Sequence, residues 1–133
     1  MATLTKHTLS HGNSGRGVLV SGTTAAGSVP LHASATGDLD IDFDEVWLWA
    51  NNNTSATVDL TVIWGLSASG DLGDTKLGNA DALVYEVTPK TRFTLANGRL
   101  LQNGLSACGY VDGGTGSEIV IDGYVNRIVG TPH

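Results

Sequence analysis

The residues with the clearest potential for chemistry are four aspartates at alternate positions. They are Asp38, Asp40, Asp42 and Asp44. Alternate residues of an extended chain point to one side, so these carboxylates share a face and offer the oxygen ligands that Ca²⁺ prefers. A calcium loop of the EF-hand type needs glycine at its sixth position and glutamate at its twelfth, where this chain has Phe43 and Trp49. We therefore interpret segment 38–45 as a solvated acidic edge that discourages aggregation, with a bound cation as the open alternative.

The histidines and the cysteine form no recognisable catalytic or metal-binding motif. The four histidines are His7, His11, His32 and His133. The spacing of His7 and His11 suits metal binding on a helix, but the surrounding Thr, Ser, Gly and Asn residues disfavour a helix. Cys108 has apolar neighbours, which predicts a buried, inert thiol. The sequence contains no nucleophile elbow, phosphate loop or dinucleotide fingerprint, so we expect no enzyme, metal or cofactor; a hydrolase with two converging carboxylates is the alternative.

Charge and hydropathy argue against two classes of partner. The net charge is −6, and the seven basic residues are scattered along the chain. A phosphate-binding surface needs clustered Lys and Arg, so we expect no nucleic-acid partner. No apolar run approaches the ~20 residues that span a membrane, and the N-terminus lacks the apolar core of a signal peptide. We expect a protein that is made and kept in a cytoplasm, or is released from it by lysis.

Short alternating runs separated by Gly, Asn, Asp and Pro predict an all-β protein. The expected strands are 17–21, 28–34, 44–50, 57–64, 83–88, 105–111 and 118–128, and 91–95 continues one of them past Pro89. About eight strands at this spacing indicate an antiparallel β-sandwich or barrel, and we expect a jelly roll. An immunoglobulin-like sandwich is the second topology. Residues 15–133 are expected to form a single domain, and the polar residues 1–14 an N-terminal arm or a weak edge strand.

All three tryptophans lie in "EVWLWANNNTSATVDLTVIWG", residues 45–65. In strand 44–50, Trp47 and Trp49 point to one face and aliphatic residues point to the other. This strand is hydrophobic on both faces and therefore needs a cover on each side. The opposite sheet covers one face, and a loop, the N-terminal arm or a second subunit is expected to cover the other.

The second strand of this stretch has a polar face. Asp59 and Thr61 mark the outer side of 57–64, which places Trp64 on the inner side, in the core. The polar link 51–57 between the two strands is expected to close a hairpin, although it is longer than the commonest turns.

Several segments resemble short structural proteins of tailed bacteriophages. These segments are "GRGVLV", "DEVWLWANN", "VDLTVIWG", "LLQNGL" and "GYVNRI", spread from Gly15 to Ile128. Proteins of this kind look like small β-sandwich virion proteins, and they include capsid decoration (cement) proteins that clamp the outside of the head shell. The resemblance implies a decoration protein that binds the major capsid protein, forms a homotrimer and occupies the capsid surface of the virion after synthesis in the host cytoplasm.

The doubly hydrophobic strand and the N-terminal arm are the expected contact surfaces of such a protein. The candidate interface residues are Trp47, Trp49, Lys6, His7, Leu9 and His11. The alternative function is a carbohydrate-binding module, or within a virion a tail or fibre accessory module. In that alternative Trp47 and Trp49 stack on sugars, and the turn at 51–53 supplies hydrogen bonds.

Overall fold

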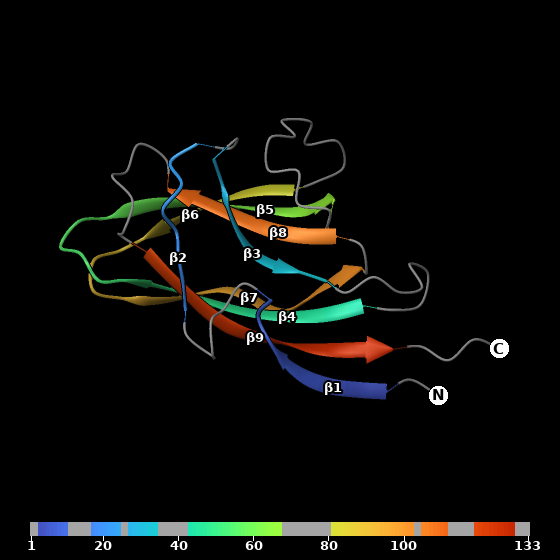
Figure 1. Ribbon diagram of the computed structural model, residues 1–133. Helices are drawn as coiled ribbons and strands as arrows, with labels where there is room; N and C mark the ends of the chain where they lie inside the picture. Colours follow the sequence, from blue (N-terminus) through green and yellow to red (C-terminus); the bar gives the residue numbers. More distant parts are fainter. Residues whose placement is uncertain are drawn as a thin grey trace.

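The computed structural model describes residues 3–10, 17–24, 27–34, 43–67, 81–102, 105–111 and 119–129. Within these residues the chain is all-β, and nine strands form two antiparallel sheets packed face to face (Figure 1). The strands are β1 (Thr3–Thr8), β2 (Val18–Leu19), β3 (Val29–Ala33), β4 (Phe43–Asn52), β5 (Val58–Ser67), β6 (Asp81–Val87), β7 (Arg92–Gln102), β8 (Leu105–Val111) and β9 (Ile119–Val129). The predicted antiparallel β-sandwich is confirmed.

The strand order identifies the sandwich as a jelly roll. We call the sheet with the order β1-β9-β4-β7 sheet A, and the sheet with the order β3-β8-β5-β6 sheet B. Strands β1 and β2 pair with successive parts of one edge of β9, so together they act as one interrupted strand. From there the chain crosses between the sheets at every connection except β5–β6, which is the pattern of two interlocked Greek keys.

The two strands that contain the tryptophans, β4 and β5, do not form the predicted hairpin. Strand β4 lies between β7 and β9 in sheet A, whereas β5 lies between β6 and β8 in sheet B. The chain passes from sheet A to sheet B directly after β4, and the buried side chain of Asn52 holds this connection by hydrogen bonds. Its Nδ2 donates to the carbonyl oxygens of Ala56 and Val87 at 2.8 and 3.0 Å, and its Oδ1 accepts from the amide of Thr54 at 2.9 Å.

Residues 91–95 belong to a separate strand and do not extend β6 past Pro89, contrary to expectation. The chain turns at Pro89 and Lys90, where Lys90 has a positive φ of 56°, and β7 then runs in sheet A. Lys90 Nζ donates to the carbonyl oxygen of Asn53 at 2.6 Å. This bond ties the β6–β7 connection to the β4–β5 connection, and the two lie side by side at one end of the sandwich (Figure 1).

The described part of the polar N-terminal segment is an edge strand. Residues Thr3–Thr8 pair with Tyr124–Val129 of β9, as the edge-strand alternative proposed. Directly after β1, Leu9 is buried in the core between the sheets. Leu9, one of the interface candidates, is therefore a core residue of the single chain. Its burial follows from the path of the chain, because Ser10 hydrogen-bonds to β3 of the opposite sheet and draws the chain inward.

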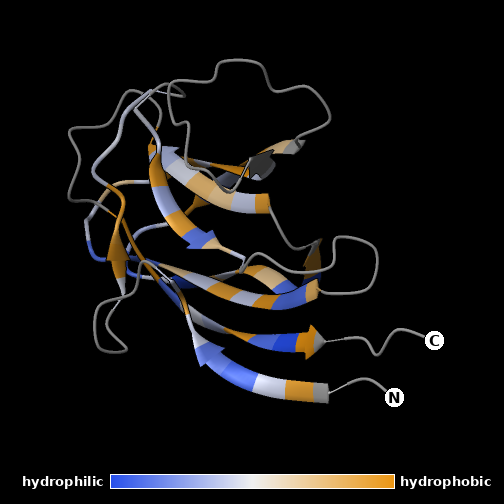
Figure 2. Cartoon of the chain, turned by 45° about the vertical axis from the view of Figure 1, so that its right-hand side comes forward, coloured by the Kyte–Doolittle hydropathy of each residue, from blue (hydrophilic) through white to orange (hydrophobic). Residues whose placement is uncertain are grey.

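The main core lies between the sheets and is built from alternate residues of the strands (Figure 2). The inward residues of β4 are fully buried, and these are Val46, Leu48 and Ala50. Trp47 and Trp49 lie on the opposite face of the same strand and are only half-buried. Trp64 of β5 is buried in this core, as predicted, and the guanidinium carbon of Arg99 lies 4.9 Å from its ring centroid.

The outer face of sheet B is partly covered. Asp59 is exposed there, as predicted, but Thr61 and Ile63 are buried on the same side of β5. Ile63 packs with Cys108 and Tyr110 in a second, small hydrophobic cluster. The alternation along β5 thus predicted the face on which each of these side chains lies. The burial of Thr61 and Ile63 on that outer face was not expected.

One glycine fixes how closely β9 and β4 approach each other. A Cβ atom at Gly123 would overlap the backbone carbonyl oxygen of Trp47, so any side chain at this position forces the two strands apart. Gly109 of β8 is a contrasting case in the other sheet. A Cβ atom there would make only ordinary contacts, the nearest at 3.5 Å to Leu31.

The substitution Gly123→Ala is expected to lower the free energy of unfolding by roughly 2–3 kcal/mol, because it overpacks the β4–β9 pairing. The matched control Gly109→Ala is expected to change it by less than about 1 kcal/mol. Urea unfolding of both variants measures the difference. Equal effects of the two substitutions would contradict a close approach at Gly123.

Candidate functional site

The outer face of sheet A carries a row of aromatic side chains. Paired residues of antiparallel strands share a face, so Tyr124 of β9 stands beside Trp47 of β4. Their rings stack with centroids 6.0 Å apart and an interplanar angle of 11°. The ring of Trp49, the next outward residue of β4, lies 6.1 Å from that of Tyr124. We call Trp47, Trp49 and Tyr124 the aromatic row; all three side chains are half-buried.

Two cations from the flanking strands border the aromatic row. Lys6 Nζ of β1 lies 4.2 Å from the ring centroid of Tyr124. The guanidinium carbon of Arg92, from β7, lies 5.1 Å from the ring centroid of Trp49. Cations over aromatic faces attract the electron-rich ring and contribute about 0.5–1 kcal/mol each at exposed sites. Strands β1, β9, β4 and β7 of sheet A therefore all contribute to one continuous surface.

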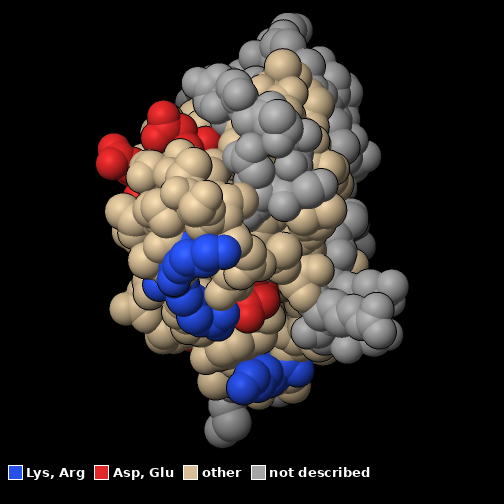
Figure 3. Space-filling view, turned by 90° about the vertical axis from the view of Figure 1, so that its left-hand side faces the viewer, with Lys and Arg blue, Asp and Glu red and all other residues tan. Residues whose placement is uncertain are grey.

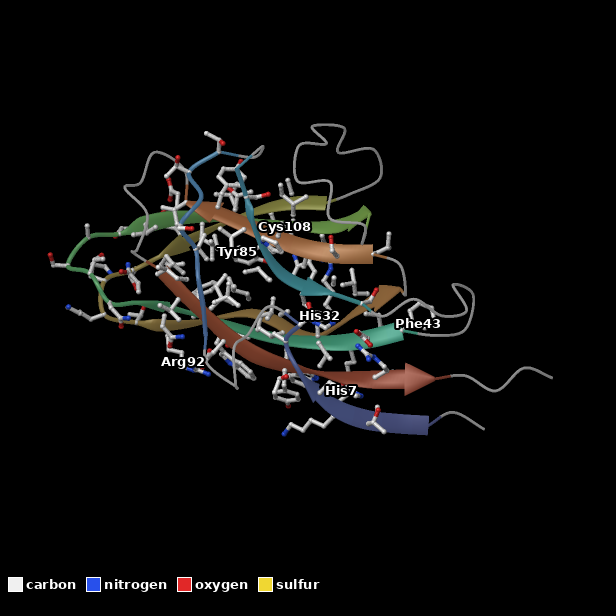
Figure 4. All side chains as sticks on the ribbon, in the orientation of Figure 1. His7, His32, Phe43, Tyr85, Arg92 and Cys108 are labelled. Carbon is white, nitrogen blue, oxygen red and sulfur yellow. The ribbon has the colours of Figure 1, made fainter. Side chains whose placement is uncertain are left out.

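Arg92 also anchors a polar end of this face. Its Nη1 donates to Asp122 Oδ2 at 2.8 Å and to Asn51 Oδ1 at 2.9 Å. Asn51 Nδ2 in turn donates to the carbonyl oxygen of Val120 at 3.1 Å. Figure 3 shows basic side chains beside an acidic one at this end of the molecule, and Figure 4 shows Arg92 on the outer side of sheet A.

Polar contacts fix the orientation of Trp47. Its Nε1 donates to Glu45 Oε1 at 2.8 Å, and Asn126 Nδ2 donates to the same oxygen at 3.0 Å. The hydrogen bonds from Asn126 and Trp47 hold the pKa of the Glu45 carboxyl below its usual value. On β7, Gly98 leaves room for the indole, because a Cβ atom there would lie 3.3 Å from Trp47 Cζ2. The ring is thus held in one orientation before any partner binds.

The other end of the same face is apolar and exposed. Leu4 of β1 pairs with Ile128 of β9, and Ile128 pairs with Phe43 of β4, so three apolar side chains lie in one line across the strands. Leu4 is 63% exposed, and Leu100 of β7, on the same face, is 55% exposed. The outer face of sheet A therefore runs from an exposed apolar end through the aromatic row to the polar end at Arg92.

The six interface candidates separate into four groups. Three of them lie together on the outer face of sheet A, and these are Lys6, Trp47 and Trp49. His7 is exposed but points to the other side of β1, where its Nε2 lies 3.0 Å from Thr5 Oγ1. Leu9 is a core residue. His11 lies outside the described residues.

Tyr124 and Arg92 belong to this face and were not among the candidates. The alternation of residues along β9 indicates that Tyr124 points outward. The buried Ile121 and Val125 point inward, and Tyr124 directly precedes Val125. Alternation does not reveal that Tyr124 pairs with Trp47, because that register comes from the fold.

A second polar cluster centres on the buried residues His32 and Asp44, and Figure 4 labels His32 between the two sheets. His32 of β3 and Arg127 of β9 both hydrogen-bond to Asp44 of β4. The distance from His32 Nε2 to Asp44 Oδ2 is 2.6 Å, and Arg127 Nε and Nη2 lie 2.9 and 3.1 Å from Oδ1 and Oδ2. His32 Nδ1 accepts the amide of Ser10 at 3.0 Å, so the ring donates through Nε2. The cluster joins both sheets to the segment that follows β1.

The prediction of a solvated acidic edge is wrong for Asp44, because this residue is fully buried. Its position alternates in phase with Val46 and Leu48, so it points into the core, and Arg127 and His32 satisfy its charge and hydrogen bonds there. The other three acidic residues of that stretch, Asp38, Asp40 and Asp42, lie outside the described residues.

The partners of Asp44 keep its carboxyl ionised. Burial by itself would raise the pKa of Asp44, but the hydrogen bonds from His32 and Arg127 and the charge of Arg127 lower it from 3.8 to about 2. The hydrogen bond to Asp44 correspondingly raises the pKa of Arg127. Both carboxylate oxygens accept hydrogen bonds from within the fold. We therefore assign this cluster a structural role.

Cys108 is buried, as predicted, and burial raises the pKa of its thiol. Among the described residues, no group of three or more His, Cys, Asp or Glu side chains is placed to hold a metal ion. The same part of the chain contains no helix that is long and apolar enough to cross a membrane.

The chain matches no protein-family model, and no curated protein or solved structure is significantly similar to it.

Acid is expected to remove the stabilisation that Asp44 provides. Its folded pKa of about 2 lies below the ordinary 3.8, so the contribution is complete above the ordinary value and is lost as the pH falls through the folded value. We expect this loss to amount to roughly 2 kcal/mol of unfolding free energy between about pH 5 and pH 1. Urea unfolding over a pH series measures it.

Two variants make this test specific. Asp44→Asn should be less stable at neutral pH and should lack this part of the acid dependence. Asp122→Asn removes the exposed ion pair with Arg92 and leaves the Asp44 cluster intact, so it should keep the acid-dependent loss assigned to Asp44 and lose less than about 1 kcal/mol at neutral pH. An unchanged acid dependence in Asp44→Asn would contradict the role given to the buried cluster.

Proposed function

We propose that this chain is a structural protein of a tailed bacteriophage virion, namely a capsid decoration (cement) protein that binds the outer head shell. Support comes from the resemblance of five segments to such proteins and from the jelly-roll fold, an architecture common in viral capsid domains and lectins. The proposal assigns the outer face of sheet A to contact with the major capsid protein.

The observation that carries the proposal is the composition of that face. Aromatic residues and Arg are enriched in the cores of protein interfaces, and Trp, Tyr and Arg are the commonest hot-spot residues. The aromatic row supplies Trp and Tyr at the centre of the face, and Arg92 supplies Arg beside Trp49 at its polar end. Leu4 and Leu100 add exposed apolar area beside them. A contiguous surface of this kind is typical of a protein-binding site.

The proposed protein stabilises the shell by mass action. Whatever binds only the assembled shell shifts the equilibrium toward that state. The contacts that orient Trp47 before binding reduce the entropy lost on association. This role needs no catalytic group. The homotrimer and the location on the capsid surface, which the resemblance implies, stay predictions.

The carbohydrate-binding alternative receives less support from the same side chains. A sugar stacks on an open aromatic face. In the aromatic row, Tyr124 stacks with Trp47 and has Lys6 over its ring, while Arg92 lies over Trp49. Ring faces that are already engaged favour a partner that contacts ring edges and flanking apolar side chains, as another protein surface does.

Trp47→Ala and Trp49→Ala are expected to weaken shell binding by about 30-fold each, the effect of losing a hot-spot tryptophan. The measurement is co-sedimentation of the purified chain with head shells assembled from the major capsid protein encoded in the same genome. Folding stability, followed by urea unfolding, should change less than binding does, because both rings are half-buried on the surface.

Two controls separate binding from folding. Tyr110→Ala truncates a half-buried aromatic on the other sheet and should leave shell binding unchanged. Trp64→Ala should instead lower the free energy of unfolding by roughly 3–5 kcal/mol, as aromatic truncations in cores do. The proposal is wrong if the wild-type chain does not bind shells, and saccharide binding lost in Trp47→Ala would favour the carbohydrate alternative.

A further inference from the structure

The two sides of the sandwich, where the edge strands of the two sheets face each other, are covered in different ways. On the side of β1 and β3, the segment after β1 crosses to the other sheet through Ser10, and Leu9 is buried beneath it. On the side of β6 and β7, Tyr85 contacts Phe93 edge-on with centroids 5.8 Å apart. Tyr85 Oη also donates to the carbonyl oxygen of Leu95 at 3.3 Å. We call this second side the β6/β7 margin.

Large apolar side chains are exposed at the β6/β7 margin. Val84 is 68% exposed, Phe93 38% and Leu83 36%. The register with β5 places Leu83 and Tyr85 on the inner face of sheet B, beside the core, and Val84 on its outer face. Among the residues that the structure describes, β5 is the only strand that pairs with β6, and an edge strand that presents apolar side chains is a template for another strand.

Strand β6 lacks the features that protect the other sheet edges. At the edge of sheet B, β3 contains Pro30 and a register shift, and at the edge of sheet A, β7 contains two register shifts. The short edge strand β1 carries Lys6. Proline, bulges and lysine all discourage pairing with a further strand. By contrast, β6 pairs with β5 in unbroken register over Asp81–Val87 and contains no Pro, Lys or Arg.

We propose that β6 is the docking site for a second copy of this chain, through antiparallel β6–β6 pairing about a two-fold axis at Val84. Val84 is the central residue of the strand. In this register Val84 lies opposite its own copy on the outer face, and Leu83 of one chain lies opposite Tyr85 of the other on the inner face. Sheet B of each copy then continues into that of the other.

The self-complementarity of β6 points to a second copy as the partner. Aliphatic–aliphatic and aromatic–aliphatic pairs stabilise antiparallel strands, whereas directly opposed like charges destabilise them. Pairing about Val84 gives three apolar pairs at the centre and sets Glu86 against Ala82, so no acidic residue faces another. The same pairing covers Leu83 and Tyr85 at the margin of the core, where the monomer leaves them accessible.

This inference does not rest on the capsid proposal, because it uses the edge of sheet B and not the outer face of sheet A. A β6 dimer and a homotrimer also differ in symmetry. A two-fold contact uses the same patch on both copies, whereas a trimer is closed by two different patches. The mass of the wild-type chain in solution therefore separates the β6 dimer from the homotrimer.

The test measures that mass by light scattering after size exclusion, and it adds a charge at the two-fold axis. The wild type is expected to be a dimer. Val84→Lys places two ammonium groups opposite each other and should raise the dimer dissociation constant at least about tenfold. Val84→Thr keeps a β-branched residue in the strand and should retain the dimer. Far-UV circular dichroism checks that each variant is folded.

Cross-linking locates the contact. With a short bismaleimide reagent, Val84→Cys should give a covalent dimer much faster than Leu4→Cys, an equally exposed position on the edge of the other sheet. The wild type, whose Cys108 is buried, sets the background. A monomeric or trimeric wild type, a dimer that Val84→Lys leaves intact, or equal cross-linking at the two positions overturns the proposal.

Discussion

The pairing of β4 with β9 is the interaction on which the rest of the structure depends. All ten residues of β4 pair with β9, and β7 pairs along the other edge. A strand held at both edges has two fixed faces, so its aliphatic residues complete the core while Trp47 and Trp49 meet Tyr124 outside. Gly123 permits this pairing, because its missing side chain leaves space for the carbonyl group of Trp47. The aromatic row is therefore a consequence of sheet register.

The remaining surfaces differ because the sandwich is closed unevenly. The buried hydrogen bond from His32 to Asp44 joins the two sheets, and Arg127 holds Asp44 from within sheet A. Ser10 connects the segment after β1 to β3 and closes the side of β1 and β3. The β6/β7 margin instead has exposed apolar residues, and its edge strand β6 contains no Pro, no Lys and no register shift. Shell binding is assigned to the outer face of sheet A and self-association to the edge of sheet B. Because these surfaces do not overlap, the two proposed contacts are compatible with each other in one chain.

Side-chain alternation predicted the fold class, the two faces of β4 and the burial of Trp64, because direction along a strand has a period of two. It could not predict which sheet a strand joins, so residues 51–57 were expected to form a hairpin although they connect two sheets. The prediction that Asp44 lies on a solvated edge was wrong because its charge was given more weight than its position in the alternation of β4, where it falls on the same face as the core residues. Its partners, His32 and Arg127, come from other strands, and the pairing of Tyr124 with Trp47 likewise depends on the tertiary fold.

The central claim is that the outer face of sheet A binds the head shell. The proposal places this chain in the virion of a tailed bacteriophage, and an electron cryomicroscopy reconstruction of that particle tests the claim most directly. The account predicts jelly-roll density on the outside of the shell, with Trp47, Trp49 and Tyr124 against the major capsid protein. A particle without this density, or one in which the aromatic row faces solvent and sheet B meets the shell, would contradict it.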